Sequence, residues 1–205
     1  GDLDFEDAVN IFKKSFNIAL KQKIDCILIE TMNDGYETKA AVLAAKESLQ
    51  ENKIDLPIFV TNVYDSDARL LSGATPESMV AMLEGLGVDA IGINCSLGPE
   101  QMLPVVSKLS KVSSLPIIVN PNAGLPRVQN GKTVFDVEPT EFVQTMEQIV
   151  ELGACVIGGC CGTNPTYIKE LTQKLSNAKI QPITQKNLSV ISSGTKTVYF
   201  QKDKP

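Results

Sequence analysis

The chain has 205 residues, a net charge of −5 and 43% hydrophobic residues, values typical of one globular domain with a sizeable core. The acidic balance without a basic tract argues against a nucleic-acid surface, and no apolar run approaches the roughly 20 residues that a membrane helix needs. The sequence contains no histidine, which excludes Ser-His-Asp and Cys-His catalysis and any zinc site built on imidazole.

The first residues, GDLDFEDAVN, are acidic and lack both an initiator Met and a signal-peptide pattern. We therefore interpret Gly1 as the edge of a longer or processed chain. The five cysteines are widely spaced and odd in number, a pattern typical of a reducing compartment. The expected location is the cytoplasm.

Strands and helices are predicted to alternate along the chain after a first helix over residues 4–22. The strands are nearly continuous in apolar residues, as in strands buried on both faces, and cover 26–31, 57–64, 90–96, 116–122 and 155–161. The helices are Ala-rich or repeat apolar residues at spacings of three and four, and cover 36–51, 76–87, 99–112, 139–152 and 165–176. Helix starts are marked by a capping or small residue before Pro76, Pro99 and Pro165.

This alternation predicts an α/β fold with a parallel sheet, either doubly wound or part of a (β/α)8 TIM barrel. No Gly-rich nucleotide fingerprint follows any strand, which favours the barrel. Because a barrel needs eight strands, we expect a barrel truncated to about the last five βα units plus the preceding helix. Such a sheet has open edges. We therefore expect self-association with a second copy through those edges, or a piece that survives from a cleaved protein.

Two segments depart from the βα repeat. Asn130-Gly131 lies between strand-like flanks and predicts a hairpin over 127–135, a small flap over one end of the domain. After residue 178 the repeat is lost and Ser, Thr, Lys and Gln become common. We therefore divide the chain into a barrel domain, 1–178, and a linker or tail, 179–205, towards a following domain.

Cys95, Cys160 and Cys161 fall at the carboxyl ends of predicted strands, the end that carries the active site in barrels. We predict that their thiolates bind one Zn²⁺ and leave the fourth tetrahedral position to a substrate. Three thiolates on a divalent cation leave a net charge of −1, which disfavours water activation and favours alkylation of a thiol substrate. The alternatives for the adjacent pair are a strained disulfide, or one core and one surface thiol. We expect Cys26 and Cys155, early in their strands, to be small buried core residues.

Three motifs at the ends of successive predicted strands carry a resemblance to a known family: GINCS (92–96), PNAG (121–124) and GGCCGT (158–163). In this order they resemble the homocysteine S-methyltransferase family over about residues 5–178. The resemblance implies a (β/α)8 barrel, zinc ligands at Cys95, Cys160 and Cys161, and zinc-dependent methyl transfer to the thiol of L-homocysteine, giving methionine.

The resemblance also implies residues that bind the substrate. Glu30, in LIET, matches the acidic residue that holds the amino-acid ammonium group, and the alternative is an ion pair with a nearby Lys. Asn122 matches the PNAG asparagine, whose side chain is able to take the open metal position without substrate; the alternative is an Asx-turn cap before Gly124. Asn94 is the third candidate, and we expect it to fix the loop around Cys95 rather than to touch substrate.

Members of the family differ in methyl donor: methylcobalamin, betaine or S-methylmethionine. The tail stretch VISSGTKTVYF (190–200) resembles the linker that precedes the folate-binding domain in cobalamin-dependent methionine synthases. This implies methylcobalamin on another module, with cobalamin and folate modules of the parent chain as partners. We expect the parent protein to be the active enzyme. We expect the truncated chain to retain zinc binding, because all three ligand cysteines are present. Whether the truncated chain is itself active stays an open question.

Two other classes of function stay open. A structural module whose thiols bind zinc for stability, or form a redox-sensitive disulfide, predicts a fourth protein ligand or a sulfur–sulfur bond. A barrel enzyme such as an aldolase or isomerase, with Glu30 as acid or base, requires a phosphate-binding loop or a partner Lys at a strand end, and the sequence shows neither.

Overall fold

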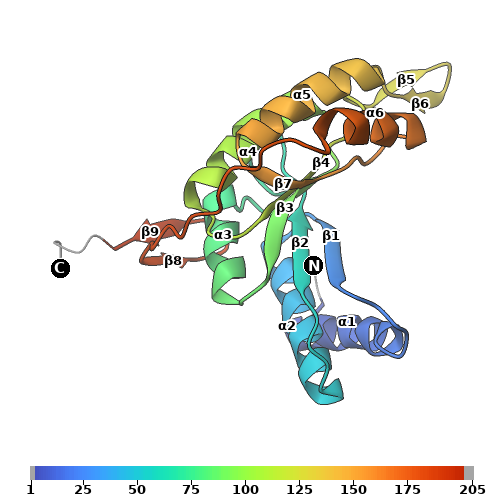
Figure 1. The fold of residues 1–205 in the computed structure, drawn as a ribbon. Helices are drawn as coiled ribbons and strands as arrows, with labels where there is room; N and C mark the ends of the chain where they lie inside the picture. Colours follow the sequence, from blue (N-terminus) through green and yellow to red (C-terminus); the bar gives the residue numbers. More distant parts are fainter. Residues whose placement is uncertain (1–2, 201–205) are drawn as a thin grey trace.

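A five-stranded parallel sheet forms the centre of the structure, a computed structural model that describes residues 3–200 (Figure 1). Its strands lie in the order β1 (Ile27–Met32), β2 (Ile58–Asn62), β3 (Ala90–Asn94), β4 (Ile117–Asn120) and β7 (Ala154–Ile157). Each strand therefore pairs with that of the next βα unit, which confirms the predicted α/β class and is the order of consecutive barrel strands. Over residues 3–200 the sheet ends at β1 and β7 and does not close into a barrel.

The helices of the described chain coincide with the predicted segments: α1 (Phe5–Ala19), α2 (Gly35–Asn52), α3 (Pro76–Gly85), α4 (Pro99–Val112), α5 (Pro139–Glu151) and α6 (Pro165–Leu175). The start signals act as expected for two of them, since the side chains of Thr75 and Asn164 accept hydrogen bonds from the first turns of α3 and α6. Gly98 precedes Pro99 at the start of α4 and provides no side-chain cap.

The core lies between the sheet and its helices. Ile29, Val60, Ile91 and Ile117 pair in register across β1 to β4, and each is at most 5% exposed. Helices α2, α4 and α5 contact the strands. Towards the two ends of the sheet the strands also expose apolar side chains, because Leu28 on β1 is 46% exposed and Val156 on β7 is 44% exposed.

The prediction that Cys26 and Cys155 are buried core residues was wrong. Cys26 is exposed and Cys155 is half-buried, with its thiol donating to the Gly153 carbonyl at 3.4 Å. Cys26 lies two residues before the exposed Leu28 and so shares its face of β1, whereas Ile27 and Ile29 on the opposite face are buried. Cys155 lies on β7, at the other end of the sheet, next to the exposed Val156. Strand periodicity therefore places Cys26 on the exposed face of β1.

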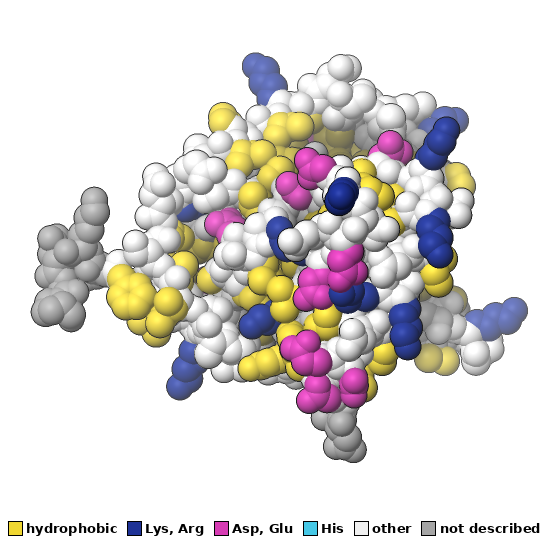
Figure 2. All heavy atoms as spheres, turned by 90° about the horizontal axis from the view of Figure 1, so that it is seen from below, with side chains coloured by type: hydrophobic (Ala, Val, Ile, Leu, Met, Phe, Trp, Pro, Cys, Tyr) yellow, Lys and Arg dark blue, Asp and Glu magenta, His cyan; other side chains and the backbone are white. Residues whose placement is uncertain are grey.

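The outer surface carries both signs of charge. Lys13 on α1 forms ion pairs with Glu47 and Glu51 on α2, at 2.9 and 2.7 Å, which join the two helices outside the sheet. On the face seen in Figure 2, acidic and basic side chains are interspersed and neither sign forms a continuous block. Within the described residues no helix combines the length and the apolar character that crossing a bilayer requires.

The predicted hairpin at Asn130-Gly131 is confirmed. β5 (Arg127–Gln129) and β6 (Lys132–Val134) pair antiparallel, with Gln129 opposite Lys132. The two turn residues have φ values of 51° and 70°, as a two-residue hairpin turn requires. The hairpin projects beyond the ends of α5 and α6 (Figure 1).

The tail forms a second hairpin that the sequence reading did not predict, from β8 (Val190–Ser192) and β9 (Thr197–Tyr199). It docks on α3, where the Ser192 hydroxyl donates to the Ser78 carbonyl at 3.0 Å. The segment that leads to it is held by the Lys186 N–H, which donates to the Ser114 hydroxyl at 3.1 Å. The tail therefore packs back onto the helical layer, while the division of the chain at residue 178 stays a prediction.

Two glycines make a matched test of the packing between β3 and β4. A Cβ added to Gly92 would overlap the Ile118 carbonyl oxygen, whereas a Cβ added to Gly85 at the end of α3 meets nothing within 4 Å. We expect Gly92→Ala to lower the free energy of unfolding by about 3 kcal/mol or more, and Gly85→Ala to leave it unchanged or raise it by up to about 1 kcal/mol. Denaturant unfolding of both variants measures this, and equal stability of the two would contradict it.

Candidate metal centre

The candidate site lies at the carboxyl edge of the sheet, where β3, β4 and β7 end. Cys95 directly follows β3, and Cys160 and Cys161 lie in the loop after β7. β4 lies between these two strands, and the loop that follows it carries Asn122. Parallel strands deliver their carboxyl ends to the same edge of the sheet, so residues far apart in sequence meet here.

The structure brings the three predicted ligands together. All three Sγ atoms lie within 4.8 Å of one another, and 3.6 Å separates the sulfurs of Cys95 and Cys161. Ligands at about 2.3 Å from a tetrahedral zinc ion lie about 3.8 Å from each other, so the spacing of the sulfurs suits that ion. The cluster in residues 3–200 includes no Asp, Glu or further Cys. All five cysteines are free thiols, so the adjacent pair is not a disulfide.

Two adjacent cysteines reach one site because the backbone leaves the sheet after Ile157. The Cys160 N–H donates to the Pro121 carbonyl at 2.7 Å, and the Ala123 N–H donates to the Cys161 carbonyl at 2.9 Å. Cys161 donates its own N–H to Asn122 Oδ1 at 3.0 Å. The loop after β7 is thereby paired with the loop after β4, and the strict alternation of a strand no longer applies to the two thiols.

Glycines make this loop geometry possible. A Cβ on Gly159, which precedes Cys160, would lie 2.6 Å from the Thr163 side chain, so a larger residue there would displace that side chain. Gly162, which follows Cys161, has a φ of 81° and packs against the Phe135 ring. The glycines on either side of the cysteine pair therefore permit the close approach and the turn.

The loop that carries Cys95 has a strained backbone. Cys95 and Ser96 have φ values of 59° and 63°, in the left-handed region that non-glycine residues seldom occupy. The Cys95 N–H donates to the Asn120 carbonyl at 3.1 Å, and the Leu97 N–H donates back to the Cys95 carbonyl at 2.7 Å. These bonds hold the loop in an unfavourable conformation that turns the thiol towards Cys161, and such strain is common at functional sites.

The thiols hold their protons strongly. Burial, reinforced by the hydrogen bond and charge of Cys95, raises the pKa of Cys160 to about 12. For Cys161 the hydrogen bond with Cys95 is the first cause, burial is the second, and the pKa is again raised. A cation must therefore replace these protons before the cluster can act as a set of thiolates.

Both candidate asparagines are buried and hold the site together. Asn94 is 0% exposed and Asn122 is 3% exposed. Asn122 connects the two loops through its bond from the Cys161 N–H, in place of the turn cap that was the alternative at this position. Asn94 Nδ2 lies 3.9 Å from Cys160 Sγ, and its amide also binds residues of β1 and β2. Their contacts with a substrate stay a prediction.

Glu30 lies on β1, two strands away from β3, and its side chain is exposed. The ion pairs among residues 3–200 do not include Glu30, so the Lys partner that was the alternative for this carboxylate is not formed there. The carboxylate is therefore free to meet a ligand at the carboxyl edge of the sheet.

The sequence reading missed Thr31 and Thr61, which contact Asn94 across the strand ends. Thr61 is fully buried, and Thr31 has a φ of 64°. The available signal was a polar residue near the end of each otherwise apolar strand, in LIETM and IFVTN. That signal does not tell which side chain is the partner, because the contacts span 63 and 33 residues.

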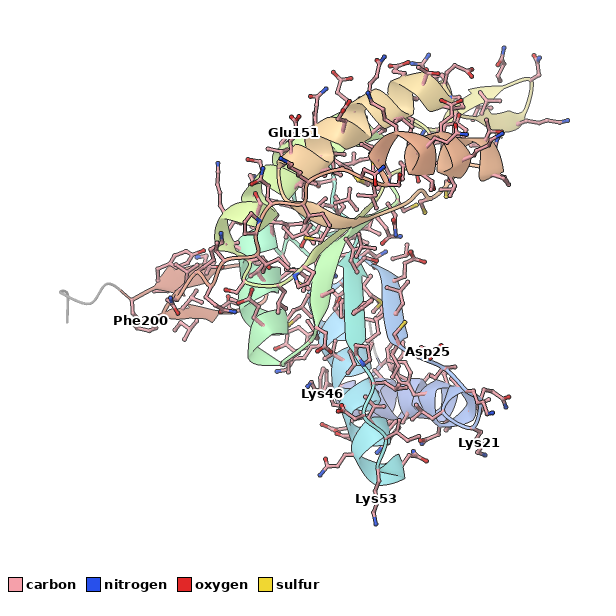
Figure 3. All side chains as sticks on the ribbon, viewed as in Figure 1. Lys21, Asp25, Lys46, Lys53, Glu151 and Phe200 are labelled. Carbon is pink, nitrogen blue, oxygen red and sulfur yellow. The ribbon has the colours of Figure 1, made fainter. Side chains whose placement is uncertain are left out.

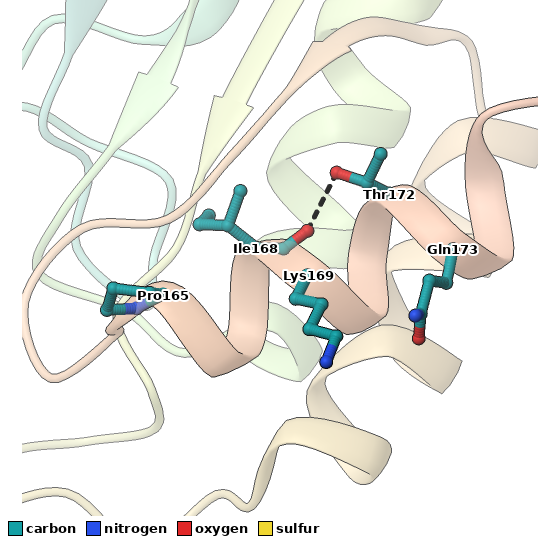
Figure 4. Close-up of a pocket in the computed structure, with 5 residues that line it drawn as sticks. All are labelled: Pro165, Ile168, Lys169, Thr172 and Gln173. Carbon is teal, nitrogen blue, oxygen red and sulfur yellow. Dashed lines mark hydrogen bonds between the residues drawn. The ribbon is translucent and has the colours of Figure 1, made fainter.

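A surface groove runs along α6, away from the thiols, and is lined by Pro165, Ile168, Lys169, Thr172 and Gln173 (Figure 4). The Thr172 hydroxyl donates to the Ile168 carbonyl at 2.8 Å and so satisfies a polar group of the helix itself. The groove contains none of the cysteines and no convergent set of polar side chains, so the candidate site is the thiol cluster.

A parallel α/β sheet with three thiols gathered at its carboxyl edge defines the class as an α/β domain whose cysteine cluster could hold a metal ion. The family model for homocysteine S-methyltransferase matches residues 1–175, and the chain belongs to that family.

Curated relatives give the next level of detail. The chain is 36% identical to the methionine synthase of Mycobacterium leprae (strain TN) over 148 residues. This matched stretch covers 72% of this chain and 12% of the relative. It is 34% identical to the methionine synthase of Mycobacterium tuberculosis (strain ATCC 25618 / H37Rv) over 156 residues, which make up 76% of this chain and 13% of the relative. The chain thus spans about an eighth of the length of these relatives.

Solved structures of the homocysteine methyltransferase MmuM from Escherichia coli share the fold. The apo form superposes with a TM-score of 0.66 at 22% identity, over 84% of this chain and 57% of MmuM. The metallated form gives a TM-score of 0.63 at 24% identity, over 81% of this chain and 52% of MmuM. The five-stranded sheet and its helices therefore resemble more than half of a homocysteine methyltransferase fold.

Zinc affinity should depend on pH, because the metal displaces protons from thiols whose pKa values are raised. From about pH 6.5 to about pH 7.5 we expect the apparent affinity to rise about tenfold for each proton released, or about 100-fold or more in total. Competition with a chromophoric chelator, corrected for its own titration, measures this.

Matched serine variants test which thiols take part. Cys161→Ser removes a sulfur of the cluster and should weaken zinc binding, whereas Cys26→Ser changes an exposed thiol outside it and should not. An affinity that does not change with pH, or that is equally sensitive to both substitutions, contradicts the assignment.

Proposed function

We propose that this chain is a homocysteine-binding module that holds Zn²⁺ through Cys95, Cys160 and Cys161 and presents the thiol of L-homocysteine for methylation to methionine. The observation that carries the proposal is the convergence of three sulfurs within 4.8 Å, with no further protein ligand in the described cluster. Structural zinc sites use four protein ligands, whereas sites with three leave one position for a substrate.

The residues present fit this metal in number, spacing and chemistry. The loops that carry the ligands are held by backbone hydrogen bonds and by Asn122, so the sulfurs are positioned without help from a metal. When bound, zinc supplies the positive charge that keeps the cysteines as thiolates and lowers the pKa of a substrate thiol. The chain itself binds and orients the substrate.

Glu30 is proposed to hold the ammonium group of homocysteine. Its carboxylate is exposed on β1, and a carboxylate is suited to a charge-assisted hydrogen bond with an ammonium group. Asn122 and Asn94 are proposed to order the loops around the sulfurs and to contact the substrate, Asn122 through its bond from the Cys161 N–H and Asn94 through its contact with Cys160 Sγ.

The methyl group is proposed to come from methylcobalamin on another module of a methionine synthase, with cobalamin and folate modules as partners. The relatives at 34–36% identity are methionine synthases and this chain spans 12–13% of their length, which supports a module of such an enzyme. The resemblance of VISSGTKTVYF (190–200) to the linker of cobalamin-dependent enzymes supports methylcobalamin as the donor. Betaine or S-methylmethionine are the alternative donors. The odd number and wide spacing of the five cysteines support the proposed reducing, cytoplasmic setting.

A second candidate function is a structural zinc site in a catalytically inactive piece. The uncovered edges of β1 and β7 favour association with further strands, in another copy or another chain. This candidate requires no affinity for a thiol amino acid, which separates it from the first.

Homocysteine binding to the zinc-loaded chain should release about one proton, because the substrate thiol loses its proton on coordination. Isothermal titration in two buffers of different ionisation heat measures the number. L-methionine, which has no thiol proton, is the control ligand and should show no buffer dependence. Binding of homocysteine with the same heat in both buffers contradicts the proposal.

Replacing Glu30 with Gln keeps the shape of the side chain and removes its charge. We expect Glu30→Gln to weaken homocysteine binding about tenfold, as for loss of one charge-assisted hydrogen bond, and to leave zinc affinity unchanged. Glu151 ends α5 (Figure 3), just before the amino end of β7 and so at the opposite edge of the sheet from the thiols, and Glu151→Gln is the matched control. Equal homocysteine affinity in the two variants refutes the role of Glu30.

A further inference from the structure

The amide of Asn94 has a partner for every hydrogen-bonding group that it offers. Its Oδ1 accepts from the Thr31 N–H at 3.0 Å and from the Thr61 hydroxyl at 2.8 Å. Its Nδ2 donates to the Thr31 hydroxyl at 2.7 Å and faces Cys160 Sγ at 3.9 Å. An amide oxygen has two acceptor positions and an amide nitrogen has two N–H groups, so all four are used.

The orientation of this amide follows from chemistry. A backbone N–H is a donor only, so the atom of Asn94 that faces the Thr31 N–H must be the oxygen. The nitrogen therefore faces Cys160, and its second N–H is directed at the sulfur. Asn94 is 0% exposed, so water does not compete for this position.

The same amide stabilises an irregular part of β1. The pairing of β1 with β2 shifts in register between Ile29 and Met32, and Thr31 within this bulge has a φ of 64°. A β-branched residue is strained in that conformation. Thr31 is bonded to Asn94 through both its N–H and its hydroxyl, so Asn94 holds the bulge that directly follows Glu30.

We infer that Asn94 is a positioning residue that joins the metal centre to the substrate-binding end of β1, an inference that rests on the proposed function. Its N–H faces Cys160 Sγ at 3.9 Å and so fixes the direction of that proposed ligand, as outer partners of metal ligands do. Its bonds to Thr31 fix the strand end that presents Glu30. One buried amide thus orients a metal ligand and the carboxylate proposed for the ammonium group.

The test compares Asn94→Ala with Asn62→Ala. Asn62 is also a buried asparagine at a strand end, 1% exposed, but it donates to Met32 and Thr38 and not to the site. Cobalt(II) is the probe metal, because its sulfur-to-metal charge-transfer band reports on the thiolates directly. Both variants should lower the unfolding midpoint, so loss of stability alone does not distinguish them.

Asn94→Ala should reduce Co²⁺ affinity by about 10- to 100-fold, the usual effect of losing an outer partner of a metal ligand. It should also move the charge-transfer band to lower energy, because the sulfur loses a hydrogen bond, and weaken homocysteine binding to the cobalt-loaded chain. Asn62→Ala should leave the band and both affinities unchanged. If Asn94→Ala behaves like Asn62→Ala, the inference is overturned while the proposed function stands. If the unmodified chain binds no Co²⁺, the proposed function fails and this inference fails with it.

A measurement on the unmodified chain covers the case in which Asn94→Ala does not fold. Loading with Zn²⁺ converts the Cys160 thiol to a thiolate, so the NMR signal of the Asn94 side-chain amide proton that faces it should move downfield. An Asn94 signal that stays in place while the cysteine signals shift overturns the inference.

Discussion

The pairing of the loop after β7 with the loop after β4 is the interaction on which the candidate site depends. In a regular strand, Cys160 and Cys161 would lie on opposite faces of the sheet. The bonds from Cys160 N–H to Pro121 and from Ala123 N–H to Cys161 replace strand pairing and turn both thiols to one side. Because these are backbone bonds, they tie the positions of the sulfurs to the fold of the two loops.

Backbone strain collects at the same edge of the sheet. Thr31, Cys95 and Ser96 all have positive φ values, and they lie directly after or at the ends of β1 and β3. Each such residue costs on the order of 1–3 kcal/mol, which the surrounding hydrogen bonds must offset. Asn94 supplies several of those bonds to Thr31, and Asn120 supplies one to Cys95. The polar residues of the site thus stabilise its conformation before they take part in any chemistry.

Much of this arrangement could be predicted from local sequence, and the remainder depends on contacts between distant residues. The apolar runs located the five sheet strands, and Thr75 and Asn164 with their following prolines located helix starts. Four strand ends, those of β2, β3, β4 and β7, were predicted too late. Small or apolar residues continue each run although the chain has already left the sheet, as Val63 and Tyr64 do after β2 and the glycines and cysteines do after β7. The hairpin of β8 and β9 was missed because its polar composition is typical of a linker, yet its strands dock on α3. The partners of Asn94 could not be predicted, since they lie 63 and 33 residues away.

The arrangement of the thiol cluster bears on the choice between the proposed substrate site and a structural zinc site. In a structural zinc site the metal provides the free energy that folds its loops. Here the loops are joined by main-chain bonds and by Asn122, and burial together with the neighbouring thiols raises the pKa values of Cys160 and Cys161. Two thiols that resist ionisation, Cys160 and Cys161, therefore lie in one small volume, an arrangement that lowers metal affinity at acid pH. This arrangement supports the proposed substrate site over the proposed structural zinc site.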